Sequence, residues 1–422
     1  MKLVNTSLYC AALGILGASW LGTAHAVPAF AHKYEKSCSY CHTAWPQLNA
    51  KGRKFKEMGY RLKEDLKGED TGASYLDGFP IGAVLVSRPY DKKSNGEREV
   101  HGIHEAEIFI AGALDKNIST FVEMEAEDEN DWGVEFGHAV LNYRQDDAVN
   151  VQLSWGPLFF ADPYGTIVDH FSPTVSHYAL VNGEGGVVNG PGAADFGGAD
   201  GASYDADTDE VTSGGALGDQ RHNVVLNGRI DKFFYIAGIS GLAGSKTGEK
   251  NTVLSGRLAY DINENMMVGV LMATGKTSLD ITTLGAKDYS FTRTGIDFMG
   301  DFGSSRLQAG YITAKDDNGP EYDAGTSSWT SLGSGSQSNN VLSIQGMHTY
   351  KTEKGKPTWV PVARYEKYTK NDGNDKYADM VLGVSYFLKE NVKAMVEYKS
   401  DMDAPTGVDK EKRTTLQINV GL

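Results

Sequence analysis

The chain has 422 residues and carries 40 Lys or Arg against 55 Asp or Glu, which gives a formal net charge of −15 at neutral pH. This negative charge disfavours nucleic-acid binding, and no stretch reaches the roughly 18 consecutive apolar residues of a membrane-spanning helix. Such values are typical of a soluble protein, but the pattern of segments along the chain indicates a different class.

Residues 1–26 have the features of a secretory signal peptide. Lys2 provides a short positive start, a mostly apolar stretch covers residues 8–21, and Ala24-His25-Ala26 supplies an A-x-A cleavage site. The apolar stretch is too short to span a membrane. We therefore expect an exported protein whose mature chain begins near Val27.

The most specific motif in the chain is the run Cys38-Ser39-Tyr40-Cys41-His42, which has the C-x-x-C-H spacing of a c-type haem attachment site. Two thiols one helical turn apart can each bond a vinyl group of the porphyrin, and the adjacent histidine can bind the iron. A structural zinc site is disfavoured because it needs four ligands, and a redox dithiol because no βαβ context surrounds the motif. Cys38 and Cys41 are predicted to hold one haem covalently, with His42 as its proximal axial ligand.

Residues 27–75 form the predicted monohaem cytochrome c segment, which is basic in an otherwise acidic chain. Pro46 at a helix start, followed by apolar residues at helical spacing, predicts one amphipathic helix; these residues are Leu48, Phe55, Met58 and Leu62. Gly52 weakens this helix prediction. About fifty residues are too few to bury a haem alone, so we expect the segment to lean on the rest of the protein.

Residues 76–422 are predicted to form a porin-like transmembrane β-barrel. Segments of about ten residues alternate in character and are bounded by turn residues, as transmembrane strands do. The last one places Leu416, Ile418 and Val420 on one face, with Gln417 and Asn419 opposite. We predict sixteen strands: 81–90, 104–114, 118–127, 134–143, 149–157, 222–230, 233–242, 252–261, 266–274, 290–300, 305–314, 341–351, 358–369, 377–388, 391–400 and 413–422.

Connections between the predicted strands alternate between short and long along most of the chain. The short ones are 115–117, 145–148, 231–232, 262–265, 301–304, 352–356 and 389–390, and the long ones are 91–103, 158–221, 243–251, 275–289, 315–340 and 401–412. Outer-membrane barrels have this asymmetry because their periplasmic turns are short and their external loops are long. The predicted fold class is therefore an all-β outer-membrane barrel of about sixteen strands with a small α-helical N-terminal haem segment.

Carboxylates recur on one stretch of the predicted inner wall. A barrel of this size encloses an aqueous lumen, so its inward positions should be polar; the inward carboxylates are Glu105, Glu107, Glu123, Glu125 and Glu127. They could form a path for cations, and an ordinary charged pore wall explains them equally well. The long loop 158–221 has ten Asp or Glu and no Lys or Arg between Ala161 and Gln220. Such a loop should not collapse on apolar contacts, but it would attract cations to the barrel entrance.

The chain resembles the fused outer-membrane monohaem cytochrome–porins of iron-oxidising bacteria. The resemblance rests on the order of the parts and on a set of residues near the haem motif: Phe30-Ala31, Ser37 to Thr43, Pro46, Leu48-Asn49, Gly52 to Lys56 and Gly59-Tyr60. It implies an oxidoreductase with one c-type haem that oxidises extracellular Fe(II) and passes the electron to a periplasmic carrier such as a cytochrome c. It also implies an integral barrel in the outer membrane lipid of a Gram-negative bacterium.

With that resemblance, Glu105, Glu107, Glu123 and Glu125 become candidates for an Fe(II) path. Because one haem must then serve both sides of an apolar band about 25 Å tall, we expect residues 27–75 inside or against the periplasmic opening of the barrel. The basic helix could face the acidic wall around Glu105 and Glu123.

The distal haem ligand stays open at this stage. Met58 would give a high-potential His/Met iron and His32 a lower-potential bis-histidine iron, while His104 and Met395 could reach in from the barrel wall. Met58 is also a plausible apolar-face residue. Two other functions remain: an outward electron conduit for metal reduction, or a solute porin with a haem plug.

Overall fold

The computed structural model describes residues 28–63, 66, 81–166, 171, 173, 203–205, 210–212, 217–218, 220–241, 252–281, 285–317, 320–323, 328–331 and 335–422. The predicted signal peptide, residues 1–26, lies outside the described residues, as does most of the stretch from 64 to 80. No helix in the described part of the chain is long and apolar enough to cross a bilayer.

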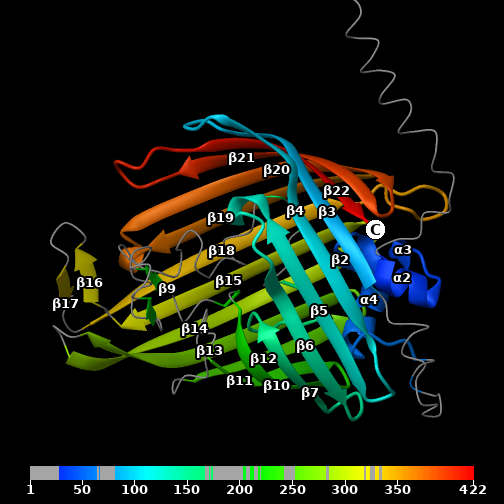
Figure 1. Ribbon diagram of the computed structural model, residues 1–422, viewed down its shortest axis with the longest axis horizontal. Coiled ribbons are helices and arrows are strands. Elements are labelled where there is room, and N and C mark those ends of the chain that lie inside the picture. The colour runs from blue at the N-terminus through cyan, green and yellow to red at the C-terminus, as the bar shows by residue number, and fades with distance from the viewer. Residues whose placement is uncertain are drawn as a thin grey trace, which may run out of the picture.

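Sixteen antiparallel strands form one closed barrel, so the predicted fold class and strand number are confirmed (Figure 1). Strands that are successive in this barrel pair with each other, and β22 pairs with β3 to close it. The barrel strands are β3 (Ile81–Lys93), β4 (Arg98–Ala113), β5 (Ile118–Glu127), β6 (Glu135–Arg144), β7 (Asn150–Gly156), β10 (Arg221–Ile230), β11 (Phe233–Ser240), β12 (Val253–Asn263), β13 (Met266–Ile281), β14 (Gly285–Phe302), β15 (Ser305–Asp317), β18 (Ser336–His348), β19 (Trp359–Lys370), β20 (Asp375–Lys389), β21 (Val392–Asp403) and β22 (Lys412–Gly421).

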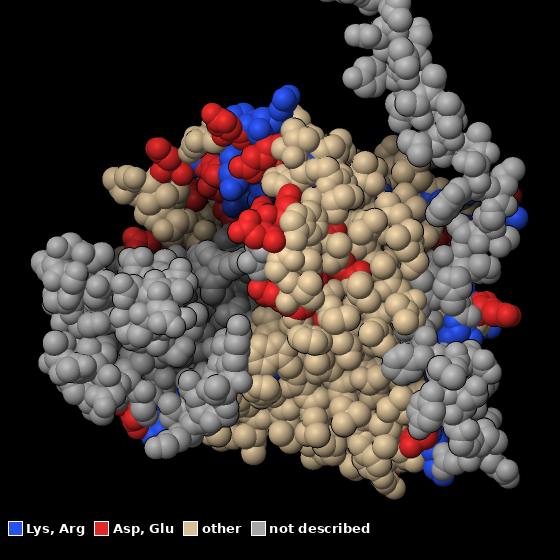
Figure 2. Space-filling model, in the orientation of Figure 1, with Lys and Arg blue, Asp and Glu red and all other residues tan. Residues whose placement is uncertain are grey.

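Strand alternation places apolar side chains outside the barrel and polar ones inside. In β10, Val224 and Leu226 are 55% and 41% exposed, whereas Asn223 and Asn227 are buried. A soluble protein has the reverse arrangement, and lipid around the barrel is the environment that this outer face fits. Figure 2 shows the result as an uncharged band across the strands, with charged residues gathered toward the ends.

The two ends of the barrel differ. One end, here called the turn end, has short connections such as 114–117, 231–232 and 303–304. The opposite loop end carries two small hairpins, β8–β9 (Ser203–Asp205 and Glu210–Thr212) and β16–β17 (Pro320–Asp323 and Ser328–Ser331), and two 3-10 turns, η1 (Asp128–Asn130) and η2 (Asn371–Gly373).

Two predicted long loops are mostly strand. Residues 91–103 contain the ends of β3 and β4, and residues 275–289 contain the ends of β13 and β14. In Figure 1 the β3–β4 hairpin extends past β5 at the loop end, because β5 pairs with β4 only as far as Glu105. These extensions carry charged residues such as Lys92, Arg98 and Glu99, so a search for lipid-facing strands misses them.

The lumen is not uniformly polar, contrary to the prediction. Inward residues of β11 and β14, including Phe234, Ile236 and Phe291, form an apolar cluster that Leu158 and Phe159 join from the start of the long loop. That loop was expected not to collapse on apolar contacts. Its first residues do so because Leu158, Phe159 and Ala161 are apolar, and Asp162 among them pairs with Arg257 of β12 at 3.3 Å.

The described residues before the barrel, 28–63, form short elements that we call the N-terminal segment. They are α2 (Pro28–Tyr34), α3 (Cys38–Cys41), β1 (His42–Ala44), β2 (Gln47–Leu48) and α4 (Ala50–Glu57). The predicted helix start at Pro46 is wrong: α4 begins after Asn49, whose side chain accepts hydrogen bonds from the N–H groups of Lys51 and Gly52. Figure 1 shows these helices beside one end of the barrel.

Candidate functional site

The cysteine motif forms a single helical turn. Helix α3 starts at Cys38 and ends at Cys41, so both thiols belong to one turn, and neither is in a disulfide. Burial, partly offset by Lys51, raises the pKa of the Cys41 thiol to about 11. This environment disfavours a thiolate, which a metal ligand or a redox cysteine needs, but not an uncharged thioether.

The His42 ring is oriented by a hydrogen bond to the loop that follows it. Its Nδ1 lies 2.8 Å from the carbonyl oxygen of Pro46. Burial lowers the pKa of His42 to about 4, so the imidazole is neutral at physiological pH. A backbone partner at Nδ1 fixes the tautomer and leaves Nε2 as the ring nitrogen for a metal.

The start of helix α4 packs against the backbone of the cysteine motif. The side-chain amide of Asn49 donates to the carbonyl oxygens of Ser39 and Tyr40. A Cβ at Gly52 would lie 2.1 Å from the carbonyl oxygen of Cys41, so only glycine allows this approach of α4 to α3. Gly52 weakened the helix prediction, and its place near the helix start explains why the helix tolerates it.

The N-terminal segment is bound across the turn end of the barrel. Arg53 pairs with Asp301 at 3.2 Å and donates to the carbonyl oxygen of Glu264. Glu57 pairs with Arg229 at 2.5 Å, and the Ser39 N–H donates to Glu390 at 3.0 Å. These partners come from the β12–β13 and β20–β21 turns, from the end of β14 and from β10, so contacts reach widely separated parts of the rim.

The basic residues of α4 pair with carboxylates other than Glu105 and Glu123, which were expected from the sequence. Arg53 pairs with Asp301, and Lys54 pairs with Asp147 at 3.6 Å. Both carboxylates lie at the turn end, whereas Glu105 and Glu123 lie further along β4 and β5. Helix α4 lies across the opening rather than deep in the lumen. Its Lys and Arg side chains therefore reach carboxylates at the turn end.

The residues around the motif fit a c-type haem by their chemistry. Two unlinked thiols on one turn and a neutral, oriented imidazole form the required donor set. Ala44 and Trp45, directly after the motif, pack in an apolar cluster with barrel residues that include Val360, Phe387 and Met395. Gln47 Nε2 is buried without a hydrogen-bond partner, which leaves a donor for a further acceptor group.

The candidate distal ligands lie in different places. Met58 is buried at the C-cap of α4, and Met395 is buried on β21 in the same cluster as Ala44. His104 lies on β4 ten residues before the turn end, or roughly 30 Å along the strand, and its Nδ1 is 2.8 Å from Asp128. The His32 side chain lies outside the described part of the chain.

The five inward glutamates share one face of β4 and β5, and we call them the glutamate wall. Glu105 is directly opposite Glu127, and Glu107 is directly opposite Glu125. Like charges at facing positions of a sheet destabilise it, so a bound cation would relieve repulsion there. Glu123 is instead 2.7 Å from His138 Nδ1.

An aromatic cluster joins the glutamate wall to the N-terminal segment. Phe121, two residues from Glu123 on the same face, stacks on Tyr60 with 5.3 Å between ring centroids. Tyr60 stacks on Phe30 at 5.6 Å, and Phe30 contacts Phe55 of α4 at 4.9 Å. Since Tyr60 belongs to the segment that covers the opening, the face bearing Phe121 and the glutamates is the luminal one.

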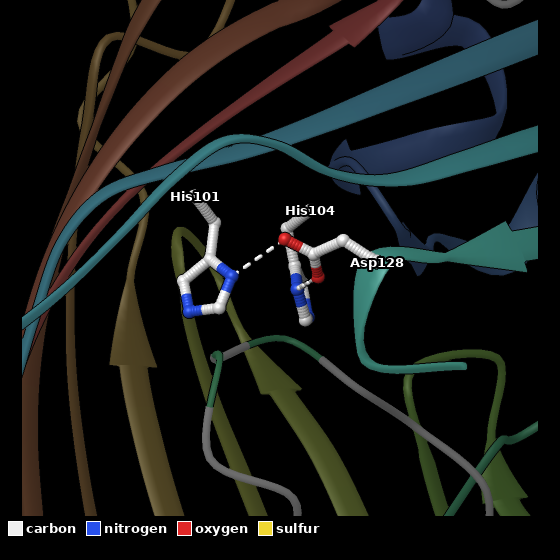
Figure 3. A group of neighbouring side chains, drawn as sticks. All are labelled: His101, His104 and Asp128. Atoms are coloured by element: carbon white, nitrogen blue, oxygen red, sulfur yellow. Dashed lines mark hydrogen bonds and ion pairs between the residues drawn. The ribbon is translucent and has the colours of Figure 1, made fainter. Parts of the chain in front are cut away.

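A group of possible metal ligands at the loop end was missed from sequence. His101 and His104 of β4 and Asp128 of η1 have ligand atoms within 4.8 Å of one another (Figure 3). The only sequence signal is the spacing His-x-x-His, which places two side chains on opposite faces of a regular strand. A register irregularity between β3 and β4 at Val86 and Arg88 interrupts that alternation.

Comparison with known proteins supports the fold. No protein-family model and no curated protein matches the chain. It is similar to an anion-selective porin from Comamonas acidovorans (12% identity, TM-score 0.54, 82% of this chain and 99% of the porin). It is also similar to OmpT of Vibrio cholerae in its trimer form (10%, 0.52, 81% and 98%) and to the outer membrane channel DcaP of Acinetobacter baumannii (11%, 0.50, 83% and 99%). At these identities the likeness shows a porin-like barrel fold.

Proposed function

We propose that this protein is an outer-membrane cytochrome that oxidises extracellular Fe(II) and delivers the electron to a periplasmic carrier, a cytochrome c. Each Fe(II) becomes Fe(III) and each oxidised carrier takes up one electron. The porin-like fold supports a location in the outer membrane of a Gram-negative bacterium. The turn end, with the N-terminal segment, then faces the periplasm.

One observation carries the proposal. A segment with the complete C-x-x-C-H motif is bound at one opening of a barrel whose inner wall carries carboxylates toward the other opening. A porin needs no such segment, and a periplasmic cytochrome needs no barrel. The combination gives a redox centre access to solutes that enter from the far side.

Cys38, Cys41 and His42 hold the haem in this proposal. A haem bound there supplies a one-electron carrier, and Met58 as distal ligand would give it a high potential suited to Fe(II). His42 is kept neutral and oriented by Pro46. Asn49 and Gly52 keep α3 and α4 in contact, so the two cysteines stay on one helical turn.

The glutamate wall would guide Fe(II). Carboxylate oxygens attract divalent cations, and a lumen with walls of low dielectric concentrates the field of its charges. Glu105, Glu107, Glu123 and Glu125 are the proposed path. Glu107 faces Glu125 directly and shares its side of β4 with Glu105, so these carboxylates are near enough to one another to bind a cation together.

Anaerobic mixing of Fe(II) with the purified, oxidised protein tests this function. We expect prompt growth of the reduced haem absorption bands. In the Glu107→Gln/Glu125→Gln variant the rate should fall several-fold and lose part of its dependence on ionic strength, because exposed charges are screened by salt. The matched control is Glu353→Gln, which removes a carboxylate from the β18–β19 turn and should leave the rate unchanged.

Other outcomes favour the other functions. If dithionite reduces the haem but Fe(II) does not, and the haem potential is low, an outward conduit for metal reduction fits better. If Fe(II) has no effect and the protein conducts ions in planar bilayers, a solute porin with a haem plug fits better. Either result would contradict the proposal.

A further inference from the structure

Two imidazoles and a carboxylate converge at the loop end of the barrel (Figure 3). The Nδ1 atom of His101 lies 2.6 Å from one carboxylate oxygen of Asp128, and the Nδ1 atom of His104 lies 2.8 Å from the other. The two rings are also in contact, with centroids 5.2 Å apart. Asp128 therefore lies between two histidines that can each present a nitrogen toward it.

These spacings suit a shared metal ion. Ligand atoms bound at about 2.1 Å to one ion are roughly 3 Å apart, close to the two histidine–carboxylate distances, and all three residues offer ligand atoms within 4.8 Å of one another. Metal binding would require each ring to carry its proton on Nε2 and to give the Nδ1 lone pair to the ion, which is an ordinary tautomer of neutral imidazole. Small side-chain shifts are then enough to admit the ion.

The surroundings provide the partners that metal-binding histidines usually have. His101 Nε2 is 3.7 Å from a carboxylate oxygen of Glu99, so a second carboxylate lies near this ring. His104 is 3% exposed, so its ring is fixed by packing. Glu105 and Glu127 of the glutamate wall face each other and directly adjoin His104 and Asp128 in the sequence, so this group is continuous with the wall.

We infer that His101, His104 and Asp128 form a binding site for a divalent first-row transition ion at the outer entrance of the lumen. Two imidazoles with one carboxylate favour such ions over Mg²⁺ or Ca²⁺, which prefer oxygen ligands. Three protein ligands leave positions open, so the ion can exchange. That it is Fe(II), held before it enters the lumen, rests on the proposed function.

Calorimetric titration of the tag-free, haem-containing protein with Co(II) tests the site. We expect one Co(II) bound per chain with an affinity that excess Mg²⁺ or Ca²⁺ does not abolish. His104→Gln and Asp128→Asn should each weaken this binding by roughly tenfold or more, since loss of even a ligand's own partner costs about that much. Glu99→Gln should weaken it less.

His348→Gln is the matched control. His348 is a half-buried histidine at the turn end, with Nδ1 2.7 Å from Ser305 Oγ, so it reports general loss of an imidazole and should leave Co(II) binding intact. Heat-modifiable migration on gels checks that each variant has a folded barrel. Absence of Co(II) binding, or binding unchanged in both His104→Gln and Asp128→Asn, would show that the three residues are only a hydrogen-bonded group.

The two proposals fail separately. If Co(II) binds as expected but Fe(II) never reduces the haem, the metal site stands and the proposed function falls. If Fe(II) reduces the haem at the same rate in His104→Gln and no Co(II) binds, the function stands and this site falls.

Discussion

At the scale of single residues, the cysteine motif depends on neighbours that are not part of it. Gly52 allows α4 to touch the Cys41 carbonyl, Asn49 bonds two carbonyls within the motif, and the Pro46 carbonyl orients His42. From the sequence, the motif alone predicted the two thiols and the imidazole that would hold a haem. Its supports could not be predicted, because they depend on the path of the chain through residues 43–49.

Gly52→Ala should disrupt the contact between α3 and α4. The new Cβ would lie 2.1 Å from the Cys41 carbonyl oxygen, and overpacking of this kind costs about 1–3 kcal/mol. We expect trypsin to cleave the N-terminal segment faster and haem incorporation to fall. The matched control is Gly346→Ala on β18, where a new Cβ would contact nothing within 4 Å, and it should change neither. Unchanged cleavage in Gly52→Ala would mean that α4 does not pack as described.

Cys38→Ser combined with Cys41→Ser should abolish covalent haem. The protein would then lose haem staining on denaturing gels, while the barrel keeps its heat-modifiable migration because the strands do not depend on the thiols. Ser39→Ala changes a residue between the cysteines and should retain the stain. Staining that survives the double substitution would rule out thioether attachment at these positions.

At the scale of elements, the barrel strands could be predicted from sequence, but the packing inside the lumen and the position of α4 could not. Alternation and turn residues identify each lipid-facing strand, since the membrane imposes a strict period of two. The membrane imposes nothing on the lumen, so the apolar cluster around Phe234 and the seat of α4 follow from tertiary contacts alone. The strand irregularity that joins His101 to His104 was equally invisible to a search for alternation.

Asp301→Asn should loosen the N-terminal segment from the turn end. Asp301 pairs with both Arg53 and Arg306, whose side chains are 5% and 2% exposed. Removing the negative charge of Asp301 leaves two buried guanidinium groups without their shared partner. Breaking a buried ion pair in this way costs roughly 3–5 kcal/mol. We expect higher single-channel conductance in planar bilayers, because the segment would cover the opening less of the time.

Asp288→Asn provides the comparison for that measurement. Asp288 pairs with Lys276 on the protruding β13–β14 hairpin, where both side chains are more than half exposed, so loss of this pair should cost about 1 kcal/mol or less. Its conductance should match that of the unmodified protein. Equal conductance in Asp301→Asn and Asp288→Asn would contradict the view that Asp301 holds the segment in place.

At the scale of the whole molecule, the arrangement has a direction. The possible metal ligands lie at the loop end, the glutamate wall follows along β4 and β5, and the aromatic cluster around Tyr60 leads to the N-terminal segment at the turn end. The sequence predicted the barrel, the haem motif and the inward glutamates as separate features. Their order in space follows from strand register and from where the segment binds.

Electron transfer across a sealed bilayer tests the central claim most directly. The haem-containing protein is placed in liposomes that enclose an oxidised soluble cytochrome c, and Fe(II) is added outside under anaerobic conditions. We expect the enclosed cytochrome to become reduced, and the Cys38→Ser/Cys41→Ser protein not to support this reduction. No reduction with the haem-containing protein, or equal reduction with the double variant because Fe(II) simply passes through the lumen, would contradict it.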